Sequence, residues 1–251
     1  MLKGKKIACI IPARLKSKRF PEKILKKIGN KSILQWIWEN SNKMNIFDYI
    51  VFAIDSEKTA KHIKNFGGKY IMTSENCNSG TERIIEIFKK DKINADIWLN
   101  WQGDNPFVNK QTILDLFVNI GETDIDIWTL KKEIYDKNKL KSPNTVKVVT
   151  DKNDFALYFS RSEIPYNRDN IEIDYYKHVG LYAYTSDALK KISSFKNCSI
   201  EESEKLEQLR FLYNNLNIKV ELTEQETIGI NTPEDLKEAR IIYENNRDKF
   251  D

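Results

Sequence analysis

The residues best suited to chemistry lie in a basic loop near the N-terminus. Residues 7–11 have the apolar, β-branched character of a buried strand, and Pro12 removes a backbone donor, so the chain is expected to leave the sheet there. A dense set of cations follows: Arg14, Lys16, Lys18, Arg19 and, past a second proline, Lys23. The chain contains neither the G-x-G-x-x-G fingerprint nor the G-x-x-x-x-G-K-[ST] loop, which disfavours a dinucleotide-binding fold and a P-loop ATPase. We therefore expect side chains to hold a polyphosphate in this loop.

Asp104 is the best candidate for a metal ligand. It follows the apolar stretch 96–101 in the segment NWQGDNPF, where Gln102 is its polar neighbour. A carboxylate at a strand end beside a phosphate loop suits Mg²⁺, which takes few protein carboxylates and completes its octahedron with water and phosphate oxygens. An ordinary turn aspartate is the alternative. The location of Asp104 favours the metal.

The segment SGTER, residues 79–83, predicts the start of a helix. Ser79 or Thr81 can cap the helix, and Glu82 is favourable in its first turn. A cation near a helix N-terminus opposes the helix dipole. We therefore expect Arg83 to serve a ligand or an acidic partner.

A second group of polar residues lies in the C-terminal half. Strand alternation in KHVGLYAY puts four residues on one face: His178, Gly180, Tyr182 and Tyr184. A buried, hydrogen-bonded histidine is the common role for such a residue. Its neighbours Arg161, Lys177 and Tyr184 make an acidic substrate the alternative. Residues 201–213 predict a helix with Glu204, Glu207 and Gln208 on one face, where surface pairing competes with recognition of a polar substrate.

Apolar periodicity predicts the elements that position these residues. Strand-like runs alternate with helical patterns, which is typical of a mainly parallel sheet with helices on both faces. Ligands in such sheets bind beyond the carboxyl ends of strands, so we look to the loops after residues 12, 54 and 100, the second of which begins with Asp55. The predicted strands are 6–12, 49–54, 69–72, 96–100 and 126–130, and the predicted helices are 32–43, 57–66, 81–90 and 111–119.

The pattern changes near residue 145. The segment 145–200 is β-rich and aromatic, which predicts an antiparallel lobe that either forms an oligomer surface or packs into the core. A strand at 218–222 follows, and a last helix is predicted to start with Thr232 as N-cap and Pro233 in its first turn. With 251 residues, we expect one large α/β domain, 1–251, that carries this lobe.

Composition excludes several classes of protein. The longest apolar runs fall far short of the roughly 20 residues of a membrane span, and the N-terminal apolar stretch is shorter than a signal sequence requires, so we expect a soluble cytoplasmic protein. Three widely spaced cysteines argue against a disulfide framework and a structural zinc site. A net charge of +4 does not by itself imply nucleic-acid binding, and the basic cluster is confined to one loop.

Eight segments occur in an order that resembles one enzyme family. They are IPARLKSKRFPEK, SGTER, WQGDNP, SPNTVKVV, ALYFSRSEIPY, KHVGLYAY, EKLEQLR and GINTPEDL. Together they resemble 3-deoxy-manno-octulosonate cytidylyltransferase, the CMP-Kdo synthetase family, over about residues 6–240. The resemblance implies a Rossmann-like, GT-A-like nucleotidyltransferase fold, commonly dimeric. It also implies that CTP and an acidic eight-carbon sugar react with Mg²⁺ to give a CMP-sugar and pyrophosphate, for surface polysaccharide or lipopolysaccharide synthesis.

The resemblance also implies roles for individual residues. Lys23, near the α-phosphate, Arg14 and Asp104 would be catalytic, and Asp104 and Asn231 would hold the metal. The nucleotide would contact Arg14, Ser17, Arg19, Lys23, Ser79, Arg83 and Gln102. The sugar would contact Arg161, His178, Tyr184, Glu207 and Gln208.

Three departures from the family pattern bear on these roles. The family shows GDEP where this chain has Asn105, and a metal-binding aspartate where it has Asn231. An asparagine keeps one oxygen ligand but loses a charge, so the affinity for Mg²⁺ should fall. A His-Gln pair of the family is replaced by Cys77 and Asn78. A nucleotidyltransferase for another sugar acid or base, and a weakly active nucleotide-binding paralogue, are therefore the alternative functions.

Overall fold

The chain folds into two compact units. The computed structural model describes residues 1–17, 19–245 and 247, so Lys18 of the basic loop lies outside the described residues. Unit 1 comprises Met1–Lys110 and Glu226–Asp251, and unit 2 comprises Gln111–Gln225. The expected single domain with a lobe at 145–200 stays a prediction. Each unit is described by itself below.

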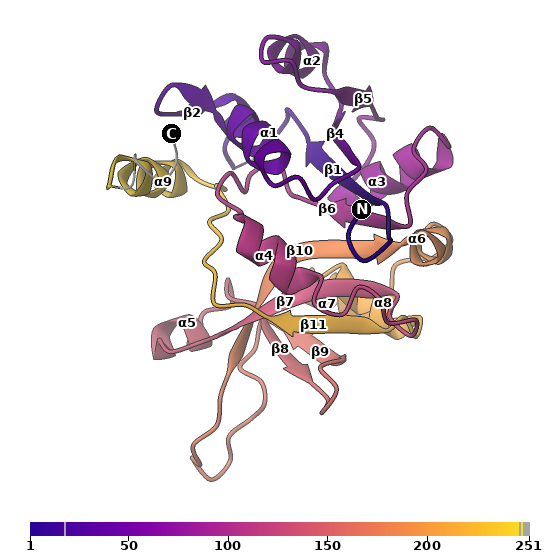
Figure 1. Cartoon of the computed structure of the whole chain (residues 1–251). Coiled ribbons are helices and arrows are strands. Elements are labelled where there is room, and N and C mark those ends of the chain that lie inside the picture. Colours follow the sequence, from indigo (N-terminus) through magenta and orange to yellow (C-terminus); the bar gives the residue numbers. More distant parts are fainter. Residues whose placement is uncertain (18, 246, 248–251) are drawn as a thin grey trace. The chain divides into compact units, whose positions relative to one another are not determined.

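Unit 1 is built on four parallel strands in the order β6-β1-β4-β5 (Figure 1). All residues of β1 are buried, as expected for a strand with neighbours on both sides. The register aligns Ala13 of β1 with Ile54 of β4, and Ile10 with Asn100 of β6, so the carboxyl ends of three strands meet at one edge. The elements of unit 1 are β1 (Ile7–Ala13), the 3₁₀ helix η1 (Lys23–Leu25), β2 (Lys27–Ile28), β3 (Lys31–Ser32), α1 (Ile33–Lys43), β4 (Tyr49–Ile54), α2 (Glu57–Lys64), β5 (Tyr70–Met72), α3 (Gly80–Lys89), β6 (Ile97–Asn100) and α9 (Pro233–Asn245).

Serine caps set the starts of the helices in unit 1. The hydroxyls of Ser32, Ser56 and Ser79 accept hydrogen bonds from backbone N–H groups in the first turns of α1, α2 and α3. Each cap is worth about 1 kcal/mol of stability, because it satisfies a donor that the helix leaves unpaired. The predicted N-cap Thr232 is confirmed, since its Oγ1 accepts from the N–H of Asp235 at 3.2 Å.

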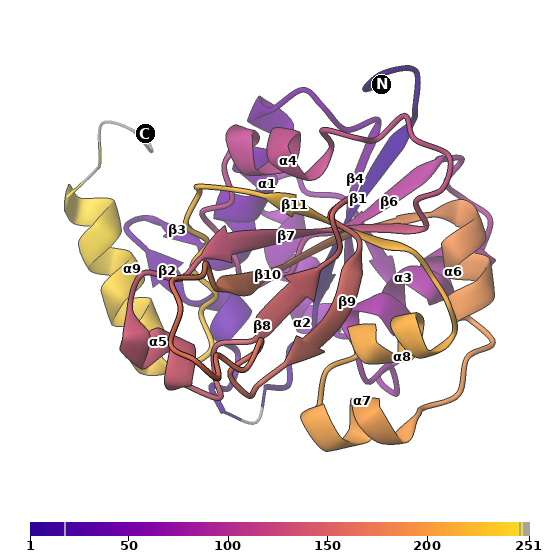
Figure 2. The same cartoon turned by 90° about the horizontal axis from the view of Figure 1, so that it is seen from below.

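Unit 2 is a mixed sheet around β7. Strand β11 pairs parallel with β7, β10 pairs antiparallel with β7, and β8 pairs with both β10 and β9. Figure 2 shows β8 and β9 together, with α7 and α8 beside each other. Between β9 and β10, the segment 161–175 projects from the strands as a long loop (Figure 1). The elements are α4 (Lys110–Leu116), which starts at the last residue of unit 1, β7 (Ile127–Glu133), α5 (Lys137–Lys141), β8 (Lys147–Thr150), β9 (Ala156–Ser160), β10 (Tyr176–Thr185), α6 (Ser186–Ile192), α7 (Ser199–Glu204), α8 (Gln208–Tyr213) and β11 (Ile218–Leu222).

One predicted helix is wrong. Residues 201–213 form two short helices, because Lys205 adopts a left-handed conformation with φ 53° and ψ 47°. Leu206, which follows the break, is buried. Glu204 therefore belongs to α7, whereas Glu207 caps α8, and the shared helical face expected for Glu204, Glu207 and Gln208 does not exist.

The predicted α/β class is confirmed. In unit 1 the strands β1, β4, β5 and β6 pair in parallel and the short strands β2 and β3 pair antiparallel, with helices between the strands along the chain. Strands 49–54 and 218–222 match their predicted bounds, and the other predicted strands match within a few residues. No helix in the described part of the chain is long and apolar enough to cross a membrane.

Candidate nucleotide site

A cavity of about 490 Å³ opens at the carboxyl ends of β1 and β6 in unit 1. It is lined by the loop after β1, the start of α3, the loop after β6 and Asn231. All the nucleotide and metal residues predicted above line it: Arg14, Ser17, Arg19, Lys23, Ser79, Arg83, Gln102, Asp104 and Asn231. Lys16, Cys77 and Asn78 also contribute to the wall. The structure thus brings together residues that are more than 200 positions apart in the sequence.

Two glycines let the backbone come close at the floor of this cavity. A Cβ on Gly103 would lie 2.5 Å from the carbonyl oxygen of Pro12, so the loop after β6 reaches β1 only with glycine there. A Cβ on Gly80 would lie 3.0 Å from Nε2 of Gln102. These close approaches hold the loop after β6 against the end of β1, and the start of α3 against the loop after β6.

The predicted metal ligands converge on one point, which Lys23 occupies. Its Nζ donates to Oδ2 of Asp104 at 2.5 Å and to Oδ1 of Asn231 at 3.1 Å. Nη2 of Arg19 also donates to Oδ1 of Asn231, at 3.1 Å. Ile230 donates its N–H to the carbonyl of Asp104 at 2.9 Å, which joins the two segments through the backbone.

This donor set fits a hard divalent cation. One carboxylate and one amide oxygen already share a cationic partner, and Mg²⁺ commonly takes one or two such ligands plus phosphate oxygens and water. No group of three or more His, Cys, Asp and Glu side chains among the described residues could hold a metal alone. A cation at Asp104 and Asn231 would therefore depend on ligands from the substrate.

Arg83 is paired inside the protein as well as lining the cavity. Its Nη2 donates to Oδ2 of Asp55 at 2.9 Å, and its Nη1 donates to Oγ1 of Thr73 at 2.7 Å. The acidic partner expected for Arg83 is thus Asp55. The sequence placed Asp55 at a strand end without a role, and only the fold shows what it contacts.

Cys77 stands in the cavity wall as a neutral thiol. Burial, together with a hydrogen bond to Glu86, raises the pKa of Cys77 to about 11. A thiol with this pKa is protonated at neutral pH and is a poor nucleophile. We therefore assign Cys77 no covalent role.

The predicted sugar-site residues all lie in unit 2. His178 and Tyr184 belong to one aromatic row on β10, in which the rings of His178 and Tyr182 lie 5.2 Å apart and those of Tyr182 and Tyr184 stack at 6.1 Å. Tyr184 also meets Phe211 of α8 edge-on at 6.1 Å. Tyr184 and Gln208 are buried, and Glu207 contacts Arg210 at 3.4 Å. Their role toward a sugar stays a prediction.

Burial keeps His178 neutral. It lowers the pKa of His178 to about 3, and Nε2 lies 2.9 Å from the hydroxyl of Thr129. Tyr182 has a hydroxyl that is buried and meets no hydrogen-bond partner among the described residues. Strand alternation predicts that Tyr182 lies on the same face as His178, but nothing in the local sequence gives Tyr182 a role.

Arg161 is held by contacts that its sequence motif does not reveal, among them two to Glu204. Its Nε donates to the carbonyl oxygen of Glu204 at 2.7 Å, and its backbone N–H donates to the carboxylate of Glu204 at 2.9 Å. The buried ammonium of Lys147 donates to the carbonyl oxygens of Ser142, Thr145 and Arg161. Burial lowers the pKa of Lys147, while the three carbonyls and the negative charges of Glu163 and Glu204 stabilise its charged form.

Comparison with known proteins defines the class first. A parallel sheet with a cavity lined by basic residues at the carboxyl ends of its strands is typical of nucleotide-binding α/β proteins. The family model "Cytidylyltransferase" matches residues 8–223. 3-Deoxy-manno-octulosonate cytidylyltransferases of Fusobacterium nucleatum and Phocaeicola vulgatus are 42% and 43% identical, covering 94% and 93% of this chain and 97% and 95% of theirs. The chain therefore belongs to the 3-deoxy-manno-octulosonate cytidylyltransferase family, which confirms the resemblance.

Solved structures agree. The structure of CMP:2-keto-3-deoxy-manno-octonic acid synthetase complexed with CTP is 35% identical, with a TM-score of 0.91 over 96% of this chain and 99% of that one. The 4-diphosphocytidyl-2C-methyl-D-erythritol synthase of Anaerococcus prevotii, at 18% identity and a TM-score of 0.62, covers 96% of this chain and all of its own and shares the fold.

Proposed function

We propose that the protein transfers the cytidylyl group of CTP to the anomeric hydroxyl of an acidic 3-deoxy-2-keto sugar, Kdo or a close variant, and releases pyrophosphate. One observation carries the proposal: the predicted phosphate and metal residues line a single cavity in a chain of this family. In this proposal the protein is a cytoplasmic homodimer, and it supplies the CMP-sugar for the synthesis of lipopolysaccharide or surface polysaccharide. It acts on small molecules rather than nucleic acid or membrane.

The reaction forms one bond and breaks one. The anomeric oxygen attacks the α-phosphorus, the bridging bond to the β-phosphate breaks, and the hydroxyl proton is lost to solvent or a base. Negative charge grows on the leaving pyrophosphate, so fixed cations at the phosphates lower the barrier. Arg14, Arg19 and Lys23 hold the triphosphate, Ser17, Ser79 and Gln102 position the nucleotide, and Arg83 completes the basic wall. Arg161, His178, Tyr184, Glu207 and Gln208 bind the sugar.

Asp104 and Asn231 would hold Mg²⁺, which when bound would supply positive charge at the phosphate oxygens. Lys23, which contacts Asp104 in this structure, would turn its ammonium toward the α-phosphate in the reaction. Asn231 contributes no charge, so this chain should need more Mg²⁺ for half-maximal binding than a chain with aspartate there.

Pyrophosphate release tests the activity. The purified protein is incubated with Mg²⁺, each of CTP, UTP, ATP and GTP, and a panel of 3-deoxy-2-keto acids that includes Kdo and amino-substituted Kdo. We expect release only with CTP and an eight-carbon acid, with the CMP-sugar detected by ³¹P NMR. Turnover with another nucleotide or another acid class would replace this function with that of a related nucleotidyltransferase.

The second candidate is a weakly active nucleotide-binding paralogue, which the asparagine at position 231 favours. The variant Asn231→Asp restores a second carboxylate at the metal site. Under the proposed activity it lowers the Mg²⁺ concentration for half-maximal rate severalfold and changes the maximal rate little. CTP binding without turnover in the wild type, with turnover appearing in Asn231→Asp, would establish the second candidate instead. Asn105→Asp, which adds the same charge in the loop after β6 rather than in the segment before α9, is the control.

A further inference from the structure

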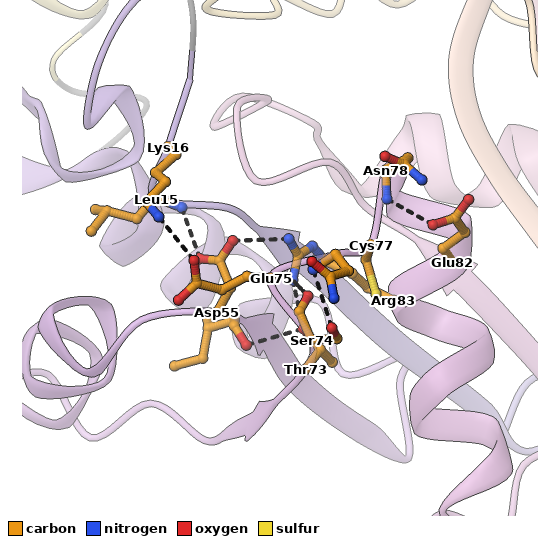
Figure 3. Close-up of polar contacts among 12 residues, drawn as sticks. Leu15, Lys16, Asp55, Thr73, Ser74, Glu75, Cys77, Asn78, Glu82 and Arg83 are labelled. Atoms are coloured by element: carbon orange, nitrogen blue, oxygen red, sulfur yellow. Dashed lines mark hydrogen bonds and ion pairs between the residues drawn. The ribbon is translucent and has the colours of Figure 1, made fainter.

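Asp55 accepts a hydrogen bond at each oxygen of its carboxylate. Oδ1 accepts from the backbone N–H of Leu15 at 3.0 Å, and Oδ2 accepts from Nη2 of Arg83 at 2.9 Å. Figure 3 shows Asp55 between these two residues. Its side chain is 5% exposed and that of Arg83 is 2% exposed. Breaking such a buried pair leaves an uncompensated charge, so the two groups hold each other in place.

Strand pairing puts Asp55 beside the phosphate loop, defined as residues 14–17 and 19–23. Ile54 ends β4 and lies opposite Ala13, which ends β1. The residues that follow these parallel strands leave the sheet at the same edge. The Leu15 amide lies between Arg14 and Lys16, so its bond to Asp55 sets the direction in which both cations leave the backbone.

The other oxygen of Asp55 sets the orientation of Arg83. Nη1 of the same guanidinium donates to Oγ1 of Thr73 at 2.7 Å and to the carbonyl of Ser74 at 3.1 Å (Figure 3). Oγ1 of Thr73 donates in turn to the carbonyl of Ile54 at 3.0 Å. A planar group held on two of its nitrogens has one orientation. The network therefore fixes Arg83 in the cavity wall.

We propose that Asp55 is the positioning residue of the triphosphate site, setting the phosphate loop and Arg83 with one carboxylate. Asp55 is not among the described residues that line the 490 Å³ cavity, and it lines an adjoining cavity of about 260 Å³ with Arg14, Lys16, Ser17 and Glu75. Its two hydrogen bonds, to Leu15 and Arg83, are the contacts through which it acts in this proposal. A negative side chain near a triphosphate repels it, whereas loss of a positioning group loosens the site. The two roles predict opposite changes in affinity when the charge is removed. The inference rests on the proposed function, because it assumes a triphosphate in this cavity.

The test compares two carboxylate-to-amide variants. Asp55→Asn removes the buried charge. Glu75→Gln is the control and removes the charge of an exposed carboxylate that contacts Lys16 at 2.8 Å. The side chain of Glu75 is 65% exposed and that of Lys16 is 84% exposed. CTP affinity is measured by calorimetry with Mg²⁺ and no sugar, and KM is measured for CTP and for Kdo. We expect Asp55→Asn to weaken CTP binding about tenfold or more and to raise KM for CTP but not for Kdo. Glu75→Gln should stay within twofold of wild type.

A third variant separates the two arms of the network. Thr73→Val removes an acceptor from Arg83 and leaves the bond between Asp55 and Leu15, so we expect a loss of CTP affinity smaller than that of Asp55→Asn. If melting temperature and circular dichroism show that Asp55→Asn does not fold, the CTP affinity of Thr73→Val tests the proposal in its place. A CTP affinity of Thr73→Val equal to that of the wild type then overturns the proposal.

Other outcomes count against the proposal directly. A folded Asp55→Asn that binds CTP as well as wild type or better overturns it, and so does an equal rise of KM for CTP and Kdo, which indicates general destabilisation. A wild type that binds CTP but releases no pyrophosphate with any acid defeats the proposed function and leaves the calorimetric comparison to judge Asp55. A wild type that binds no CTP overturns both.

Discussion

At the residue scale, Lys23 contacts the metal-site residues in this structure and the substrate in the proposed reaction. In this structure its ammonium lies between Asp104 and Asn231 with its side chain 13% exposed, and in the proposed reaction it contacts the α-phosphate. An ammonium is a compact charge on a flexible stem, which suits a group that changes partners. Its contact with the reacting phosphate is most valuable when charge develops there.

Lys23→Ala should therefore lower kcat more than it raises KM for CTP. We expect a loss in kcat of about 10²-fold, the scale for removing one group that stabilises developing charge. Lys26→Ala, which removes an exposed lysine close by, is the control and should leave both constants within twofold. Steady-state kinetics that show an unchanged kcat in Lys23→Ala would remove Lys23 from the reaction.

His178 makes the stability of the fold depend on pH. Burial lowers the pKa of His178 to about 3 in the folded protein, whereas a histidine in the unfolded chain has the ordinary pKa of 6.5. Between these values the unfolded chain binds more protons, so the free energy of unfolding falls as the pH drops from 6.5 toward 3, by up to about 1.4 kcal/mol per pH unit.

His178→Gln should flatten this dependence, because glutamine can bond to Thr129 but does not titrate. Urea unfolding of wild type and variant at pH 7.5, 6.0 and 5.0 measures the difference, which also cancels the contribution of the carboxylates. The stabilities of the two proteins should converge as the pH falls. Curves that stay parallel would mean that the histidine titrates alike in both states.

At the element scale, the break between α7 and α8 depends on one backbone conformation. Lys205 has φ 53°, a region in which every residue except glycine meets a clash with its own Cβ. Leu206 is buried directly after it, and the main chain of Glu204 holds Arg161. The break thus lets α7 anchor the Arg161 loop while α8 turns its apolar residues inward.

Lys205→Gly should stabilise the protein by about 0.5–1 kcal/mol, because relief of the strain outweighs the added freedom of the unfolded chain. Lys196→Gly changes an exposed lysine in a loop of the same unit without a positive φ, and it should destabilise slightly. Thermal unfolding at several scan rates measures both. A lower melting temperature for Lys205→Gly than for Lys196→Gly would contradict the strain argument.

At the scale of the whole molecule, the two predicted substrate sets belong to different units. The residues that line the 490 Å³ cavity all come from unit 1, and the predicted sugar residues all come from unit 2. CTP with Mg²⁺ should therefore slow amide exchange in the phosphate loop, the start of α3 and the loop after β6. Exchange in β10 and α8 should change only when a sugar acid is added.

Hydrogen exchange with mass spectrometry measures this separation on the full chain. Inorganic pyrophosphate, which lacks the nucleoside, is the matched control and should protect the phosphate loop but not the start of α3. Protection of β10 by CTP alone, as strong as that of the phosphate loop, would contradict the assignment of the two sets.

The sequence by itself determined the type of most helices and strands and the residues that line the 490 Å³ cavity. Apolar periodicity is a local property, so strands such as 49–54 and the cap at Thr232 could be predicted from neighbouring residues. The order of the family motifs then predicted the basic residues and Asp104 that line the cavity, because these residues stand in motifs that the family resemblance covers.

Tertiary structure decided the contacts between residues far apart in the chain. Asp55 contacts Leu15 and Arg83, Lys23 joins Asp104 to Asn231, and Lys147 contacts the Arg161 carbonyl. In each contact the partner is brought close by the fold, and the neighbouring residues in the sequence do not specify it. The break at Lys205 was hidden for a similar reason, since burial of Leu206 overrides a good local helix pattern. Helix propensity contributes tenths of a kcal/mol per residue, whereas loss of a buried charge partner or of a packed side chain costs several kcal/mol. The tertiary contacts therefore override the local preference, and they can be seen only in the folded chain.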